Sequence, residues 1–153
     1  MTILITHKEP TSSVSGQETL PALPLVAEER EKARQRLTLG DHTEIYLQLP
    51  RGSILHPGDI LFTHDAKAVA RVEARPEPVY TLRAAEPFFL MRAAYHLGNR
   101  HVAMEISPEY LRIKPDHVLA HLIAHLGDLD LVEETAPFVP DAGAYRSHGH
   151  THA

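Results

Sequence analysis

Histidine is the residue type in this sequence whose number and placement could support chemistry. The 153 residues include 12 histidines and no cysteine. An imidazole nitrogen is a ligand for Ni²⁺, Cu²⁺ and Zn²⁺, whereas the lack of cysteine excludes disulfides, thiolate zinc sites, iron–sulfur clusters and a cysteine nucleophile. Most of the histidines lie near the C-terminus: His96, His101, His117, His121, His125, His148, His150 and His152. We therefore expect this part of the chain to bind a divalent metal through nitrogen ligands.

His101 closely follows Gly98-Asn99, a pair that predicts a left-handed end to a helix. A lone imidazole holds a divalent ion only weakly, because useful sites need three or more ligands. A surface histidine without a role is the alternative interpretation. We expect His101 to form a site only where two copies of the chain meet and each contributes one imidazole.

At the C-terminus His148, His150 and His152 alternate with glycine and threonine. An extended segment places such alternating residues on one side, and small spacers let a backbone wrap an ion. A chelating tail is the favoured interpretation, and a tail without function is the alternative.

Three further histidines, His117, His121 and His125, are spaced four residues apart. A pair at this spacing can chelate a metal from one helix face, although the glutamate of a zinc-protease HExxH motif is missing. We favour a solvated helix flank for His121 and His125, and the sequence leaves open whether these two and His96 bind metal. The remaining histidines lie at turns or strand ends and receive no role.

The elements expected around these residues form an α+β protein. Residues 1–74 should be a small β-rich domain, with strands at residues 3–6, 60–62 and 68–72 and a hairpin over residues 36–49. Residues 28–36 could be a helix or an exposed strand. Residues 73–78, with two prolines, resemble a linker. Residues 75–142 read as strand 79–83, a helix from Glu86-Pro87 to Gly98-Asn99, strands 102–106 and 111–113, a helix from Pro115 to Gly127, and strand 129–133. This βαββαβ order predicts a ferredoxin-like domain, and residues 143–153 should be a flexible, histidine-containing tail.

Composition excludes several functional classes. The net charge of −5 disfavours a nucleic-acid partner, which requires clustered Lys and Arg. No apolar run is long enough to span a membrane and the N-terminus does not resemble a secretory signal, so we expect a cytoplasmic protein. No nucleophile elbow, carboxylate pair or nucleotide-binding loop is present, so we do not expect an enzyme.

The segment 95–102, YHLGNRHV, resembles the signature of the UreE family, the urease accessory proteins that carry nickel. Further matching segments follow at residues 49–52 (LPRG), 58–61 (GDIL), 115–119 (PDHVL), 137–138 (PF) and 141–145 (DAGAY). The resemblance therefore spans most of the chain. It implies an N-terminal domain similar to the peptide-binding domain of a co-chaperone, followed by a ferredoxin-like metal-binding domain that dimerises head to head.

The resemblance also implies roles for individual residues. The family's shared metal-binding histidine maps onto His101, and its tail histidines map in kind onto His148, His150 and His152. His117 aligns with a peripheral metal-site histidine of some members, but Pro115 stands where those members have a second one.

The implied function is that of a homodimer that binds Ni²⁺ and delivers it to apo-urease through an accessory GTPase. Zn²⁺ or Cu²⁺ could occupy the same nitrogen ligands. Three other interpretations stay open: a divalent-metal buffer without delivery, a zinc-dependent hydrolase, for which no general-base carboxylate is placed, and an RNA-binding module, which the acidic charge disfavours.

Overall fold

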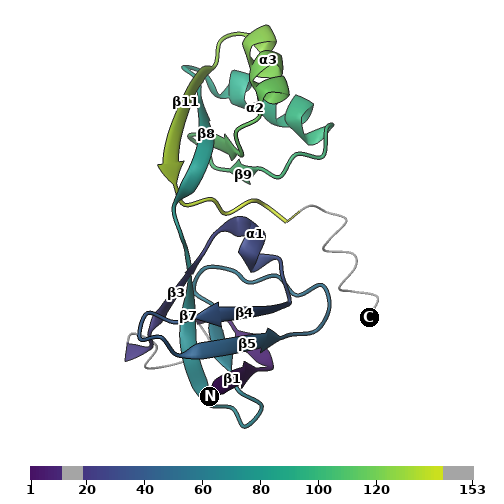
Figure 1. Ribbon diagram of the computed structural model, residues 1–153. Coiled ribbons are helices and arrows are strands. Elements are labelled where there is room, and N and C mark those ends of the chain that lie inside the picture. Colours follow the sequence, from purple (N-terminus) through teal and green to yellow (C-terminus); the bar gives the residue numbers. More distant parts are fainter. Residues whose placement is uncertain (12–18, 143–153) are drawn as a thin grey trace. The chain divides into compact units, whose positions relative to one another are not determined.

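The computed structural model describes residues 1–11 and 19–142 of the chain (Figure 1). These residues form two compact units, one comprising Met1–Arg75 and one beginning at Pro76. None of the described helices is long and apolar enough to cross a bilayer.

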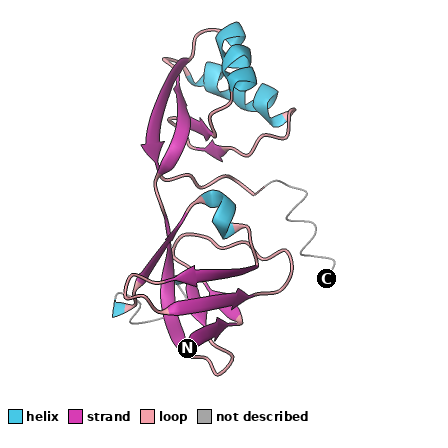
Figure 2. Ribbon diagram, viewed as in Figure 1, coloured by secondary structure: helices cyan, strands magenta, loops and turns pink. Residues whose placement is uncertain are grey.

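The first unit is built from two small sheets (Figure 2). In one sheet β1 (Thr2–Ile5), β5 (Glu44–Gln48) and β4 (Arg34–Thr38) lie in the order β1-β5-β4. In the other, β2 (His7–Glu9), β6 (Ile60–Phe62), β7 (Ala68–Ala74) and β3 (Ala22–Leu25) lie in the order β2-β6-β7-β3. Alternation explains the core, because Ile45 and Leu47 of β5 are buried while Glu44 and Gln48 at its ends are exposed. The β-rich prediction for this half of the chain is confirmed.

The hairpin expected over residues 36–49 is present, with Leu37 of β4 opposite Ile45 of β5 in an antiparallel pair. Residues 28–36, for which helix and strand were both open, contain parts of each. The short helix α1 (Ala27–Arg30) comes first, and the N–H of Val26 before it donates to the Glu29 carboxylate at 2.9 Å. The chain then enters β4.

The connection between the units is shorter than the sequence predicted. β7 continues to Ala74 and β8 (Glu77–Arg83) begins at Glu77, so only Arg75 and Pro76 lie between the two strands. The proline at position 78 did not prevent strand formation. It pairs with β11, but it lies outside the segment of β8 that pairs with β10, where a strand tolerates a proline.

The second unit has the predicted βαββαβ order. Its elements are β8, α2 (Pro87–Gly98), β9 (Glu105–Ile106), β10 (Leu111–Ile113), α3 (His117–Leu126) and β11 (Asp130–Ala136). The strands form an antiparallel sheet in the order β11-β8-β10-β9, and both helices cover one face of it (Figure 1). Leu90 and Leu97 of α2 and Ile123 of α3 pack with Leu82 and Leu111 of the sheet in one buried cluster. The ferredoxin-like α+β prediction is confirmed.

Two boundaries differ from the expectation. The strand expected over residues 102–106 is reduced to Glu105–Ile106, because Met104 accepts a hydrogen bond from Asp141 in place of a neighbouring strand. α3 begins at His117, two residues after Pro115, because the Asp116 carboxylate caps it by accepting the N–H groups of Val118 and Leu119 at 2.8 and 3.0 Å.

Candidate metal centre

The end of α2 positions His101. The His101 N–H donates to the Gly98 carbonyl at 3.0 Å, and the Val102 N–H reaches the Leu97 carbonyl at 3.5 Å. This pair of bonds is the Schellman pattern, which requires a residue with a left-handed backbone where the chain turns away from the helix. His101 is that residue, with φ of +58°.

The prediction that Gly98-Asn99 would form this left-handed end was wrong. Gly98 belongs to α2, and Asn99 has φ of −64°, in the right-handed region. The left-handed turn comes at His101, later than expected. A turn at this position lets Val102 pack against the same apolar cluster as the buried Leu97. A hydrophobic contact between these two positions commonly accompanies the Schellman pattern.

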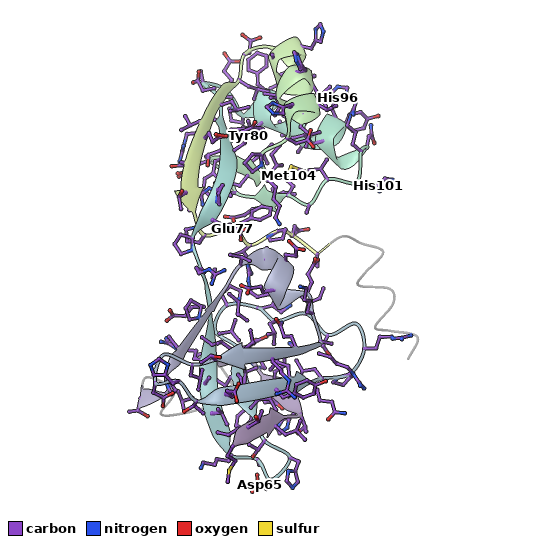
Figure 3. The ribbon with its side chains drawn as sticks, viewed as in Figure 1. Asp65, Glu77, Tyr80, His96, His101 and Met104 are labelled. Carbon is purple, nitrogen blue, oxygen red and sulfur yellow. The ribbon has the colours of Figure 1, made fainter. Side chains whose placement is uncertain are left out.

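The left-handed backbone presents the His101 side chain to solvent. The residue is exposed, and Figure 3 shows it at the periphery of the unit, in the loop that leaves α2. Within residues 1–11 and 19–142 its imidazole has no hydrogen-bond or ionic partner, and no group of three or more possible metal ligands occurs. The described residues of one chain therefore offer a single candidate ligand here.

The outer face of α2 is apolar and uncovered. Phe88, Met91 and Tyr95 are 55%, 63% and 66% exposed, although phenylalanine and methionine are among the residue types most often buried. Their spacing of three and four residues places them in one stripe along the helix, which we call the α2 stripe. A contiguous exposed apolar stripe of this kind is a candidate contact surface. The helix that carries it ends three residues before His101.

The other predicted ligand among the described residues, His117, and the histidines whose role the sequence left open differ in exposure. His117, His121 and His125 are all exposed on α3, while His96 on α2 is half-buried, with its ring edge-on to Tyr95 at 5.2 Å. The structure does not gather these residues around His101 in a single protomer. His148, His150 and His152 lie outside the described residues.

The segment after β11 returns toward the strand that follows His101. The Asp141 N–H donates to the Met104 carbonyl and the Val139 N–H donates to the Glu105 carboxylate, both at 2.8 Å, while Phe138 is fully buried. Met104 is three residues from His101, a separation of at most about 10 Å. The base of the C-terminal tail is thus fixed near His101.

A polar network holds this return segment, and sequence reasoning missed it. The Glu105 carboxylate that accepts from Val139 also accepts the Tyr110 hydroxyl at 2.7 Å. The Arg112 guanidinium lies 4.4 Å over the Tyr110 ring and 3.8 Å from Glu105. The hydrogen bond to Glu105 raises the pKa of Tyr110 above its usual value, since the bond stabilises the protonated phenol. The sequence contained one indication that Tyr110 and Arg112 share a face of the sheet, because they alternate with the apolar residues Leu111 and Ile113, which are buried.

The first unit carries an open pocket of about 540 Å³. It is lined by Glu31, Ala33, Arg34, Arg51 and Gly52. The turn that holds Arg51 is closed by a 3.0 Å bond from the Ser53 N–H to the Pro50 carbonyl, and Gly52 occupies the position of positive φ, at +86°. Two guanidinium groups and the Glu31 carboxylate therefore line one pocket.

Comparison with known proteins accounts for nearly the whole chain. Residues 5–75 match the family described as UreE urease accessory protein, N-terminal domain, and residues 77–153 match the corresponding C-terminal domain. A protein of Nostoc punctiforme named urease accessory protein UreE is 48% identical over 130 residues, which cover 85% of this chain and 87% of the relative. A protein of the same name from Pseudomonas putida strain GB-1 is 49% identical over 142 residues, covering 93% and 82%. The corresponding Microcystis aeruginosa protein is 44% identical over 137 residues, covering 90% and 85%.

Proposed function

The chain belongs to the UreE family of urease accessory proteins, and from this premise we propose that it binds Ni²⁺ as a homodimer and delivers the ion to apo-urease during urease assembly. The observation that carries the proposal is the placement of His101. An exposed imidazole without a partner among the described residues, on a left-handed backbone, stands at the end of a helix with an uncovered apolar stripe. Left-handed non-glycine residues cluster at functional sites, where the conformational cost is balanced by a role.

The α2 stripe supports the dimer. Two copies that bury Phe88, Met91 and Tyr95 against each other about a two-fold axis would cover the apolar surface that a single copy leaves exposed. Because each α2 leads into its own His101, such an arrangement brings two imidazoles to the contact. Two facing imidazoles form half of a nitrogen-ligand site, whereas one alone is a weak ligand.

The tail histidines would complete the coordination shell. Asp141 is hydrogen-bonded to Met104, and His148 follows it seven positions later in the sequence. A seven-residue chain spans at most about 25 Å, whereas Met104 and His101 are at most about 10 Å apart, so a tail of this length can reach His101. Ordering each tail residue costs about 1–2 kcal/mol, which weakens the grip and favours release to a partner.

Delivery needs a docking surface in addition to a metal site. Nitrogen ligands bind Cu²⁺ more tightly than Ni²⁺, and they also accept Zn²⁺, so the receiving protein would have to impose the choice of nickel. We assign that docking role to the first unit, in which Arg34 and Arg51 line an open pocket suited to an acidic group of the accessory GTPase or of apo-urease.

Nickel titration followed by mass spectrometry of the intact complex tests the metal site. The wild-type protein should hold one tightly bound Ni²⁺ per two chains, and His101→Ala should lose it while the dimer persists. His64→Ala, which removes an exposed histidine of the first unit, is the matched control and should bind as the wild type does. A tightly shared ion in the His101→Ala dimer would refute the assignment.

A second experiment separates delivery from buffering. In cells that lack the endogenous accessory protein, this chain should restore urease activity at limiting nickel, and His101→Ala should not. Restoration of cellular nickel content without restoration of urease activity would favour the buffer.

A further inference from the structure

We propose that α3 carries a second divalent-metal site, in which His121 binds one ion together with either His117 or His125. The site lies on a single protomer and uses neither His101 nor the tail. It can therefore be tested independently of the shared site proposed above.

The helix geometry brings these histidines into pairs. α3 is unbroken from His117 to Leu126, so residues four apart are neighbours one turn apart on its surface. Two histidines at this spacing on a helix can hold one metal ion, with metal–nitrogen distances of about 2.0–2.1 Å. The pairs His117–His121 and His121–His125 both meet this condition.

The surroundings leave the three imidazoles free to turn toward an ion. Ile123 is buried, and Leu119, Leu122 and Leu126 are half-buried in the cluster on the core side of α3. His117, His121 and His125 are exposed on the opposite side, and the described residues include no hydrogen-bond or ionic partner for their side chains. The small, exposed side chain of Ala124 leaves room beside His121 and His125.

The spacing also sets the number of ions. His117 and His125 are eight residues apart, about 12 Å along the helix axis, which is too far for both to reach one ion. His121 belongs to both pairs, and a neutral imidazole offers one free nitrogen lone pair to a metal. The site therefore holds one ion per chain, with His121 required and its two neighbours interchangeable.

A two-histidine site is weaker than one with three or more protein ligands, and water fills its remaining positions. Ni²⁺, Cu²⁺ and Zn²⁺ all suit imidazole ligands. The bound ion links successive helix turns, so it should stabilise α3 in proportion to its occupancy.

The test is a nickel titration of the full-length protein, monitored by mass spectrometry of the intact complex and by hydrogen exchange of the α3 amides. Wild type should bind one weaker Ni²⁺ per chain besides any tighter ion, and saturation should slow exchange in α3. His121→Ala should lose one ion per chain and the nickel-dependent protection. His117→Ala and His125→Ala should each retain the ion, and the double variant should lose it. His64→Ala is again the control.

Several results would overturn the proposal. Wild-type stoichiometry in His121→Ala would exclude the site. Loss of the ion in His117→Ala alone or in His125→Ala alone would show that the pairs are not interchangeable. Retention in the double variant would place the partners of His121 elsewhere in the chain. Because these side chains are exposed and alanine favours helix, the variants should keep the wild-type circular dichroism spectrum. Failure of the shared site would appear in His101→Ala and leave these outcomes unchanged.

Discussion

Replacing His101 by glycine should make the metal-free protein more stable while abolishing its tight nickel site. His101 adopts φ of +58°, a conformation that costs a residue with a Cβ atom about 1–2 kcal/mol and costs glycine almost nothing. The exposed imidazole buries little surface, so its removal should cost little free energy of folding. Glycine also gives the unfolded chain more conformational freedom, and this entropy cancels about 0.4–1 kcal/mol of the stabilisation. The net gain should be about 0.5–1 kcal/mol.

The assay compares wild type, His101→Gly and His101→Ala with a chelator present and at one protein concentration. For a unit of this size, a gain of about 0.5–1 kcal/mol corresponds to a Tm increase of roughly 2–8 °C. His101→Ala keeps the left-handed cost and should melt close to the wild type. Both variants should lose the tight ion in a nickel titration.

The two substitutions separate the backbone argument from the metal argument. If His101→Gly melts no higher than His101→Ala, the reasoning from the left-handed backbone is wrong. If both variants lose nickel regardless, His101 remains a ligand. A tight ion that survives in both variants would instead exclude His101 from the site.

Four further predictions concern the dimer, the return segment, the tail and the pocket. Met91→Glu places a charge in the α2 stripe and should weaken self-association by about 3 kcal/mol, or more than 100-fold, as measured by sedimentation equilibrium. The control Ala124→Glu, on the exposed side of α3, should leave self-association unchanged. A Met91→Glu protein that dimerises like the wild type would exclude the stripe as the contact. The Glu105 hydrogen bond raises the pKa of Tyr110 in the folded state, so its contribution to stability is complete below the usual value of 10 and is lost as pH rises through the folded-state pKa. Absorbance titration should show that Glu105→Gln lowers the pKa of Tyr110 relative to the wild type. Identical titration curves for the two proteins would contradict the bond. Truncation after Tyr145 should reduce nickel affinity and leave a weaker site dependent on His101, and unchanged calorimetry would mean that the tail is inert. Arg34→Ala with Arg51→Ala should leave nickel binding intact and lower urease activation in cells, a result that normal activation would contradict.

The fold of the second unit could be predicted because its signals are local. Pro87 at the start of α2, the buried positions Leu90, Ala93 and Leu97, and Gly127 at the end of α3 each mark an element within a few residues. The alternation of buried and exposed residues in β5 did the same for the first unit. Periodicity and helix boundary signals therefore sufficed for the order of elements.

The details that failed depend on contacts between distant residues. The end of α2 at Gly98 was predicted correctly, but the left-handed residue was expected at Gly98-Asn99 and lies instead at His101, where the packing of Val102 near Leu97 decides the turn. The strand before β10 was expected to be longer because nothing local shows that Asp141 occupies the Met104 carbonyl. Tertiary hydrogen bonds of this kind have no periodicity in the sequence.

The candidate site was predicted in part. The types and spacing of the histidines showed which residues could bind metal. They could not show that His101 itself is the left-handed residue, or that Glu105, Tyr110 and Arg112 hold the base of the tail. The left-handed conformation of His101 depends on where the chain turns after the helix. The support of the tail depends on three side chains that the pairing of β9 and β10 brings together.

The shared ion proposed at His101 would tie ion binding to subunit association through mass action, because the described residues of one chain supply a single ligand there. If the ion is shared between two copies, the factor by which nickel tightens the dimer must equal the factor by which dimerisation tightens nickel. The apparent metal affinity would then rise with protein concentration, and dilution alone would discharge the ion. A partner protein that binds one subunit and separates the dimer could therefore release the ion without itself coordinating it.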